Sequence, residues 1–154
     1  MKVQDYAHTE PKFDLFSYFE GQTTAWGQFQ DRFGTLKRRF TVDITGTVQG
    51  DTLVLDERFV YDDGEKQTRI WTIRKTADGR YIGTADDVIG EAQGESAGSV
   101  LNWSYTLALP VGERIINVQF DDWMFLQDKH TMINRAEVKK WGIQLGEVTL
   151  FFRK

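Results

Sequence analysis

Histidine and cysteine, which many enzymes use as general base, nucleophile or metal ligand, are almost missing from this sequence. The chain has two histidines, His8 and His130, and no cysteine. A His-based triad, a multi-histidine metal site, a thiolate zinc site and a cysteine nucleophile therefore cannot be built. We expect no conventional hydrolase chemistry, no metal and no cofactor, so any acid–base chemistry would rest on carboxyl groups.

Three pairs of adjacent aspartates are candidates for that chemistry: Asp62–Asp63, Asp86–Asp87 and Asp121–Asp122. The first pair precedes Gly64 and is typical of a hairpin turn. Asp121 and Asp122 end an alternating strand, where neighbouring side chains point to opposite faces. One of these two carboxyl groups must therefore face the apolar side, and a bulge near the strand end would decide which.

A buried carboxyl group needs a cation or several hydrogen-bond donors. Arg69 and Arg135 are the candidate cations on inward faces, and Asn134 could supply an amide. Such a network either joins strands together, meets the headgroup of a ligand or acts as an acid or base. The sequence leaves these alternatives open.

Glu57 raises the same question, because it lies between Leu55 and Phe59 in an otherwise apolar row. Counted outward from the turn at 63–64, Glu57 and Arg69 are nearly symmetric and so nearly opposite on adjacent strands. We predict an ion pair between them inside the protein. The alternative is a polar group directed at a ligand.

These residues lie in a long series of alternating apolar and polar runs, separated by Gly and Asp turns, from about residue 36 to 154. Consecutive hairpins of this kind close most easily into a barrel. Aromatic residues make up 14% of the chain, which also favours strands. The predicted strands are 23–32, 36–48, 52–61, 67–76, 80–86, 90–97, 99–109, 114–124, 130–135 and 146–153. We expect one all-β domain over residues 1–154, an antiparallel up-and-down barrel of about ten strands.

Three segments are expected outside this pattern. Residues 1–12 are polar and predict an extended, exposed lead-in. The aromatic segment 13–19 predicts one or two helical turns that close one end of the barrel. Residues 136–141 are helix formers followed by Gly142 and predict a short helix before the last strand.

The charge of the chain argues against nucleic acid as a partner. A formal net charge of -4 gives no positive face for a phosphate backbone. No apolar stretch approaches the roughly 20 residues of a membrane-spanning helix. From the residues alone we expect the chain as given to be soluble.

Motifs over nearly the whole chain resemble those of one family. They are Ala25-Trp26-Gly27, residues 57–64 (ERFVYDDG), Arg69-Ile70-Trp71, residues 81–87 (YIGTADD), residues 103–107 (WSYTL) and above all Asp121-Asp122-Trp123-Met124. The family is a group of proteobacterial lipoproteins defined only as a domain of unknown function, number 3833. The chain has Gly98-Ser99-Val100 where family members often have Gly-Asn-Ala.

The resemblance implies a lipocalin-like barrel and a native precursor whose signal peptide ends in a lipid-modified cysteine just before Lys2. Met1 would then be an artificial start, and the native protein would be periplasmic and tethered to a membrane, the outer membrane being expected. Membrane contact would occur only through that N-terminal lipid anchor, which this chain lacks. Family members are often encoded near genes that modify membrane fatty acids, which implies a lipid-like ligand and no particular reaction.

We therefore expect a barrel that binds a fatty acid or similar apolar molecule, with Arg69 or Arg135 meeting an acidic headgroup. The expected lining residues are Trp71, Trp103, Tyr105, Phe120 and Trp123. We predict that the three tryptophans are mostly buried and that Trp26 is partly buried. One alternative is a lipid-modifying isomerase or hydratase in which Glu57, Asp121 or Asp122 acts as acid or base. Another is a filled barrel that serves as a scaffold for envelope partners.

Overall fold

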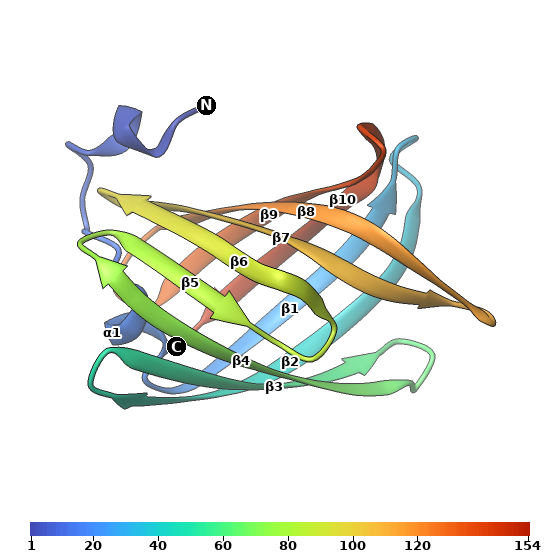
Figure 1. The fold of residues 1–154 in the computed structure, drawn as a ribbon, viewed down its shortest axis with the longest axis horizontal. Helices are drawn as coiled ribbons and strands as arrows, with labels where there is room; N and C mark the ends of the chain where they lie inside the picture. The colour runs from blue at the N-terminus through green and yellow to red at the C-terminus, as the bar shows by residue number, and fades with distance from the viewer.

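The computed structural model describes residues 1–154 as a closed antiparallel barrel (Figure 1). The strands are β1 (Gly21–Asp31), β2 (Leu36–Gln49), β3 (Thr52–Tyr61), β4 (Lys66–Ala77), β5 (Arg80–Thr84), β6 (Val88–Ala97), β7 (Val100–Val111), β8 (Arg114–Leu126), β9 (Thr131–Lys140) and β10 (Ile143–Arg153). Each strand pairs with its neighbours along the chain, and β1 also pairs with β10. The predicted up-and-down barrel is confirmed, and closure leaves no free sheet edge.

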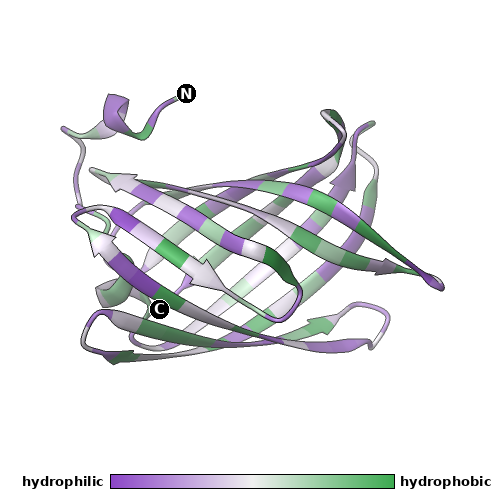
Figure 2. Ribbon diagram, viewed as in Figure 1, coloured by the Kyte–Doolittle hydropathy of each residue, from purple (hydrophilic) through white to green (hydrophobic).

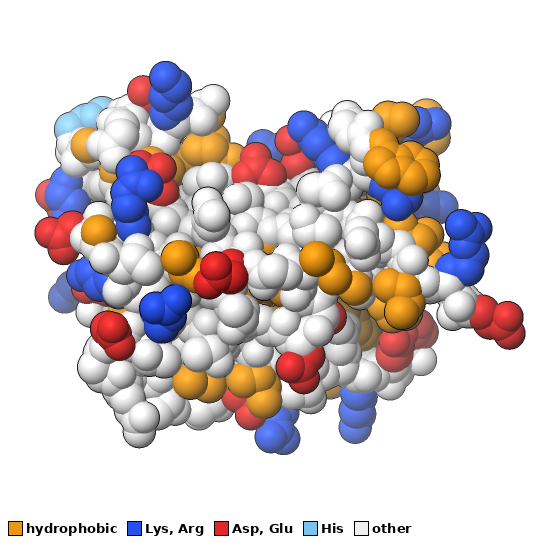
Figure 3. Space-filling model, viewed as in Figure 1, with side chains coloured by type: hydrophobic (Ala, Val, Ile, Leu, Met, Phe, Trp, Pro, Cys, Tyr) orange, Lys and Arg blue, Asp and Glu red, His pale blue; other side chains and the backbone are white.

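Hydrophobic and hydrophilic residues alternate along the strands (Figure 2), and the buried residues form one apolar core inside the barrel. Charged side chains of both signs are scattered over the face of the barrel in Figure 3. Lipocalin barrels have eight strands, and the diameter of a barrel grows with strand number. This barrel has ten strands, so its interior is wider than that of an eight-stranded barrel.

The predicted helix over residues 136–141 is wrong. Strand β9 continues to Lys140, and the chain reverses at Trp141 and Gly142, whose φ angles are 53° and 75°. Positive φ at both central residues is typical of a two-residue hairpin turn. The segment is a strand because it pairs with β8 on one side and β10 on the other, and because alternate residues such as Ala136 and Val138 are buried. Together these interactions outweigh local helix propensity.

The expected helical closure of one barrel end is confirmed by α1 (Leu15–Phe19). The helix begins at Asp14, whose carboxylate accepts hydrogen bonds from the backbone N–H groups of Phe16 and Ser17. Gly46 of β2 lets the helix approach closely, because a Cβ atom there would overlap the carbonyl group of Phe19. We call this the closed end of the barrel and the opposite end the open end.

The first residues are mostly exposed, as expected, but they are attached to the barrel and are not extended throughout. A 3-10 helix, η1 (Val3–Tyr6), contacts β6 and β7, and the side chain of Val3 is buried. The hydroxyl of Thr9 lies 2.9 Å from that of Ser99 and also accepts a hydrogen bond from the Ser99 N–H. Neither helical segment has the length and apolar character needed to cross a membrane.

Candidate ligand-binding site

The barrel encloses a cavity of about 210 Å³. Of the 29 residues that line it, 22 are hydrophobic, so it is mainly an apolar site. An apolar cavity of about 150 Å³ can hold a molecule the size of benzene, so this space is sufficient for a small ligand or part of a longer chain. Leu15 and Phe19 form its floor at the closed end, and Leu109 and Pro110 line it near the open end.

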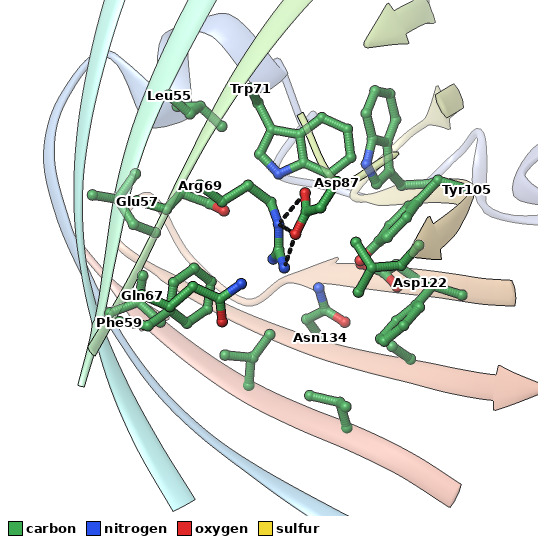
Figure 4. Close-up of a pocket in the computed structure, with 18 of the residues that line it drawn as sticks. Leu55, Glu57, Phe59, Gln67, Arg69, Trp71, Asp87, Tyr105, Asp122 and Asn134 are labelled. Atoms are coloured by element: carbon green, nitrogen blue, oxygen red, sulfur yellow. Dashed lines mark hydrogen bonds and ion pairs between the residues drawn. The ribbon is translucent and has the colours of Figure 1, made fainter. Parts of the chain in front are cut away.

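An ion pair between Arg69 and Asp87 crosses the polar side of this cavity (Figure 4). Arg69 comes from β4, and Asp87 comes from the connection between β5 and β6. Nε of Arg69 donates to both carboxylate oxygens at 3.0 and 3.1 Å, and one terminal nitrogen donates at 2.9 Å. Burial alone would lower the pKa of Arg69, but the hydrogen bonds to Asp87 raise it above its usual range. The cation is therefore permanent and already neutralised.

The predicted ion pair between Arg69 and Glu57 does not form, although the predicted register is correct. Glu57 and Arg69 are direct partners across β3 and β4, and Arg69 contacts a carboxylate as expected, but that carboxylate belongs to Asp87. Glu57 keeps limited solvent contact through the cavity that it lines. Burial raises its pKa to about 7, against the opposing effects of the Arg69 charge and hydrogen bonding by Trp71.

A second carboxyl group, that of Asp122, lies across the cavity beside Asn134. Asp122 is 6% exposed and Asn134 is 1% exposed. In each side chain the Oδ1 atom is buried without a hydrogen-bond partner. Burial raises the pKa of Asp122 to about 7, while hydrogen bonding by Asn134 opposes this rise and the charges of Asp121 and Glu57 add to it. Unsatisfied buried polar atoms are rare, and here they face a cavity.

Aromatic rings form the wall between these two polar groups. Trp71, Trp103, Tyr105 and Phe120 line the cavity as predicted. The Trp71 ring packs edge-on against Trp103 and Tyr105, with ring centroids 5.4 and 5.2 Å apart, and Tyr105 stacks on Phe120 at 5.1 Å. Gly83 leaves room for Trp103, because a Cβ atom there would come within 2.7 Å of the indole. Burial raises the pKa of Tyr105 well above its usual value, so its phenol stays neutral.

Three of the predicted site residues lie outside the cavity, because the register between β8 and β9 is regular over this region. With Asp122 and Asn134 inside, their neighbours Asp121, Trp123 and Arg135 must face outward. Asp121 accepts a hydrogen bond from the Asn102 amide at 2.7 Å. Arg135 pairs with Glu147 at 2.9 Å on the outer wall.

The burial predicted for the tryptophans is confirmed, but Trp123 does not line the cavity as predicted. Trp71 and Trp103 are buried as expected, each with 5% of its surface exposed. Trp123 is also mostly buried, but it lies on the outer wall. Trp26 is 47% exposed and packs on Phe151, with ring centroids 6.1 Å apart. An alternating row of large residues identified the strands, but it did not say which face of each strand was inward.

Sequence reasoning missed Asp87 and a group of lining residues nearer the open end. Those are Phe40, Phe59, Tyr61 and Gln67. The hydroxyl of Tyr61 donates to Oε1 of Gln67 at 2.8 Å, which fixes the amide beside the cavity. Gln67 shares the inward row of Arg69 and Trp71, so period-two alternation could have found it. The Asp86–Asp87 pair was visible, but its contact with Arg69 depends on how the turn folds.

The cavity residues suit reversible binding and proton transfer. No group of three or more His, Cys, Asp or Glu side chains is placed to hold a metal ion. Two carboxyl groups with pKa near 7 can be proton donors or acceptors close to neutral pH. The open space also means that the interior is not the filled one that the scaffold hypothesis assumed.

The sequence matches the profile of a protein family described as protein of unknown function DUF3833 over residues 1–154. The chain belongs to this family. A search of curated proteins found no match. The match agrees with the resemblance of the motifs at 57–64, 81–87 and 121–124, and the DUF3833 description carries no activity. The geometry of the cavity is therefore the basis for proposing a function.

Proposed function

We propose that this DUF3833 protein binds a small apolar molecule, such as a fatty acid in its uncharged form, inside the barrel. The observation that supports this is an apolar cavity of about 210 Å³ that carries a few convergent polar groups. Ligand pockets commonly combine a hydrophobic wall with a small number of polar atoms that orient the ligand. The hydrocarbon part would lie between the aromatic wall and the floor formed by Leu15 and Phe19.

The polar end of the ligand would meet Asp122 and Asn134 in preference to Arg69. Arg69 already makes three hydrogen bonds to Asp87, so a ligand carboxylate would have to displace that partner. The Oδ1 atoms of Asp122 and Asn134 have no partner and would gain one. A hydroxyl, an amide or a protonated carboxylic acid can satisfy them, whereas a carboxylate adds a negative charge beside Glu57 and Asp122.

Native mass spectrometry of the purified protein, together with displacement of a fluorescent fatty acid, tests this proposal. A variant that fills the cavity, Val148→Phe, should abolish both co-purified lipid and probe binding, because Val148 lines the cavity. Thr149→Phe, on the next residue of β10 and outside the lining set, is the matched control and should bind normally. No bound lipid and no probe binding in the wild type would refute the proposal.

The same binding measurement, repeated over a range of pH, shows where the polar end of the ligand lies in the cavity. Binding of the fluorescent fatty acid to the protein should weaken as pH rises through about 7, because Glu57 and Asp122 then become charged. A fatty alcohol of equal chain length carries no charge and should show a smaller loss. Equal pH dependence for the two ligands would place the headgroup away from these carboxyl groups.

A second candidate function, a lipid-modifying isomerase or hydratase, is favoured by one specific observation. The pKa values of Glu57 and Asp122 are both raised to about 7, which suits an acid or base that works near neutrality. Incubation with an unsaturated fatty acid, followed by mass spectrometry and chromatography, would detect added water or a moved double bond. Activity that persists in both Glu57→Gln and Asp122→Asn would rule out this mechanism.

We also propose that the native protein is a periplasmic lipoprotein held at the outer membrane. Support comes from the motif resemblance, whose family members carry a lipid-modified cysteine before the matching segment. Labelling of the native gene product with a radioactive fatty acid, followed by membrane fractionation, tests this. Label on the protein and its recovery in the outer membrane are expected, and an unlabelled protein in the soluble fraction would contradict the proposal.

A further inference from the structure

Three consecutive turns at the open end of the barrel expose an unusual set of side chains. They are the β1–β2, β9–β10 and β7–β8 turns, which are neighbours around the rim because β1 pairs with β10 and β8 with β9. Their exposed apolar residues are Phe33, Leu36, Val111, Ile115, Trp141 and Ile143, with 50 to 84% of each residue exposed. We call these six residues the apolar rim.

Basic residues flank the apolar rim along the chain, and of these Lys37 pairs with Asp31 and Lys139 with Glu137. Residues 31–37, 109–115 and 139–145 contain five basic residues and two acidic ones. Two of the cations lie over the rings of the rim, Arg32 at 4.8 Å from the centroid of Phe33 and Lys140 at 4.3 Å from that of Trp141. Figure 3 shows hydrophobic and basic side chains together where the β1–β2 and β9–β10 turns lie in Figure 1.

The other two turns of the open end have the opposite character. Residues 61–66 and 84–88, which form the β3–β4 and β5–β6 turns, contain five acidic residues and one basic residue. Positive charge and six exposed apolar side chains are therefore found together on one side of the open end, whereas Val60 and Ile89 are the exposed apolar residues beside the acidic turns. Such clusters mark interaction surfaces, and aromatic residues with flanking cations are typical of proteins that bind a lipid interface.

Trp141 gives an independent reason to assign a function to the rim. It has a φ angle of 53° and is 84% exposed. Positive φ is unfavourable for a bulky residue, and Asn-Gly is the sequence that such a two-residue turn prefers. An exposed aromatic residue that neither packs in the core nor suits its backbone adds nothing to folding, so its presence calls for another explanation.

We propose that the apolar rim docks the open end of the barrel onto an anionic lipid bilayer, with Phe33, Trp141 and Ile115 inserted at the interface. The basic residues beside them match the negative charge of that surface. The acidic turns on the other side tilt the barrel, so that the rim contacts lipid first.

Co-sedimentation with vesicles made of equal parts phosphatidylglycerol and phosphatidylcholine tests the proposal. The protein should bind these vesicles, bind pure phosphatidylcholine weakly and dissociate as salt is raised. Trp141→Asn should weaken binding roughly tenfold, and Phe33→Ser with Trp141→Asn should remove it. Trp26→Ala, which removes an exposed tryptophan from the barrel wall, is the matched control and should bind as the wild type does.

Thermal unfolding of the same variants separates docking from folding. Trp141→Asn should keep or raise the melting temperature, because asparagine tolerates the positive φ angle better than tryptophan does. Failure of the wild type to bind anionic vesicles, or unchanged binding by the double variant, would overturn the proposal. So would a wild-type dimer that the double variant converts to monomers, because the rim would then join two copies of the chain.

Discussion

The floor and the upper wall of the barrel are built by the same strands in opposite ways. Near the closed end, inward residues such as Ile44, Leu53 and Met132 are at most 1% exposed and pack into a continuous apolar core. Toward the open end the same inward faces carry Glu57 and Arg69, and a cavity lies between the inward faces of the strands.

This difference separates stability from function along one barrel. Burial of apolar side chains at the floor is the main favourable contribution to folding. Buried carboxyl groups in the upper wall cost free energy unless they are paired, and Asp122 keeps an unpaired oxygen there. The close packing of the floor offsets the free-energy cost of the ligand site in the upper wall.

The largest effect is expected for truncation of the floor. Leu53→Ala should reduce the free energy of unfolding by about 4 kcal/mol, because Leu53 is fully buried and the cavity it leaves is not filled. Phe59→Leu, further along β3 and already beside the cavity, should cost only about 1 kcal/mol. Urea unfolding of the two variants measures both values. Equal losses would mean that the upper wall contributes as much to stability as the floor.

The next effect concerns the ion pair in the upper wall. Asp87→Ala should destabilise the protein by about 3 kcal/mol, because it leaves the Arg69 charge without a partner in a largely buried place. Asp87→Ala combined with Arg69→Met should recover much of that loss. A double-mutant cycle from chemical unfolding provides the coupling energy. Additive losses would show that the two side chains do not stabilise each other.

A smaller, pH-dependent effect is expected for Glu57. Its pKa in the folded protein is about 7, above its usual value of 4.5, so the folded state holds the proton over a pH range in which the unfolded chain has lost it. Stability should therefore fall as pH rises from about 4.5 to about 7 and then level off. Glu57→Gln should match the wild type near pH 4 and exceed its stability by about 3 kcal/mol at pH 8.

Melting curves recorded across this pH range check the Glu57 prediction. Asp122→Asn should behave in the same direction, because the pKa of Asp122 is also raised to about 7. A stability difference between Glu57→Gln and the wild type that stays constant with pH would mean that Glu57 does not titrate in this window.

The smallest effect is expected where α1 is fastened to the closed end. The hydroxyl of Tyr18 donates to the backbone carbonyl of His130 at 3.0 Å. Tyr18→Phe removes this hydrogen bond and keeps the buried ring, so it should cost about 1 kcal/mol. Ligand binding should be unchanged, because Tyr18 does not line the cavity. Weakened probe binding in this variant would show that the floor and the cavity are coupled.

Local patterns in the sequence were enough to predict the barrel. Period-two alternation and Gly or Asp turns are local signals, and they set the strands, the hairpin at Asp63–Gly64 and the opposition of Glu57 and Arg69. The short helix at 15–19 was also readable, because the aromatic segment 13–19 predicted one or two helical turns. The prediction for segment 136–141 was wrong because its residues favour a helix locally, whereas pairing with β8 and β10 favours a strand. That pairing depends on residues distant in the sequence.

Which charged groups meet, and which face of each strand lies inside, depends on long-range packing. Asp87 reaches Arg69 because the β5–β6 turn folds back toward β4. The two residues are 18 positions apart, and no regular spacing in the sequence predicts their contact. The inward side of β8 is set by its pairing with β7 and β9, which puts Asp122 in the cavity and Trp123 outside. Alternation defines two faces of a strand, and barrel closure alone selects the one that is buried.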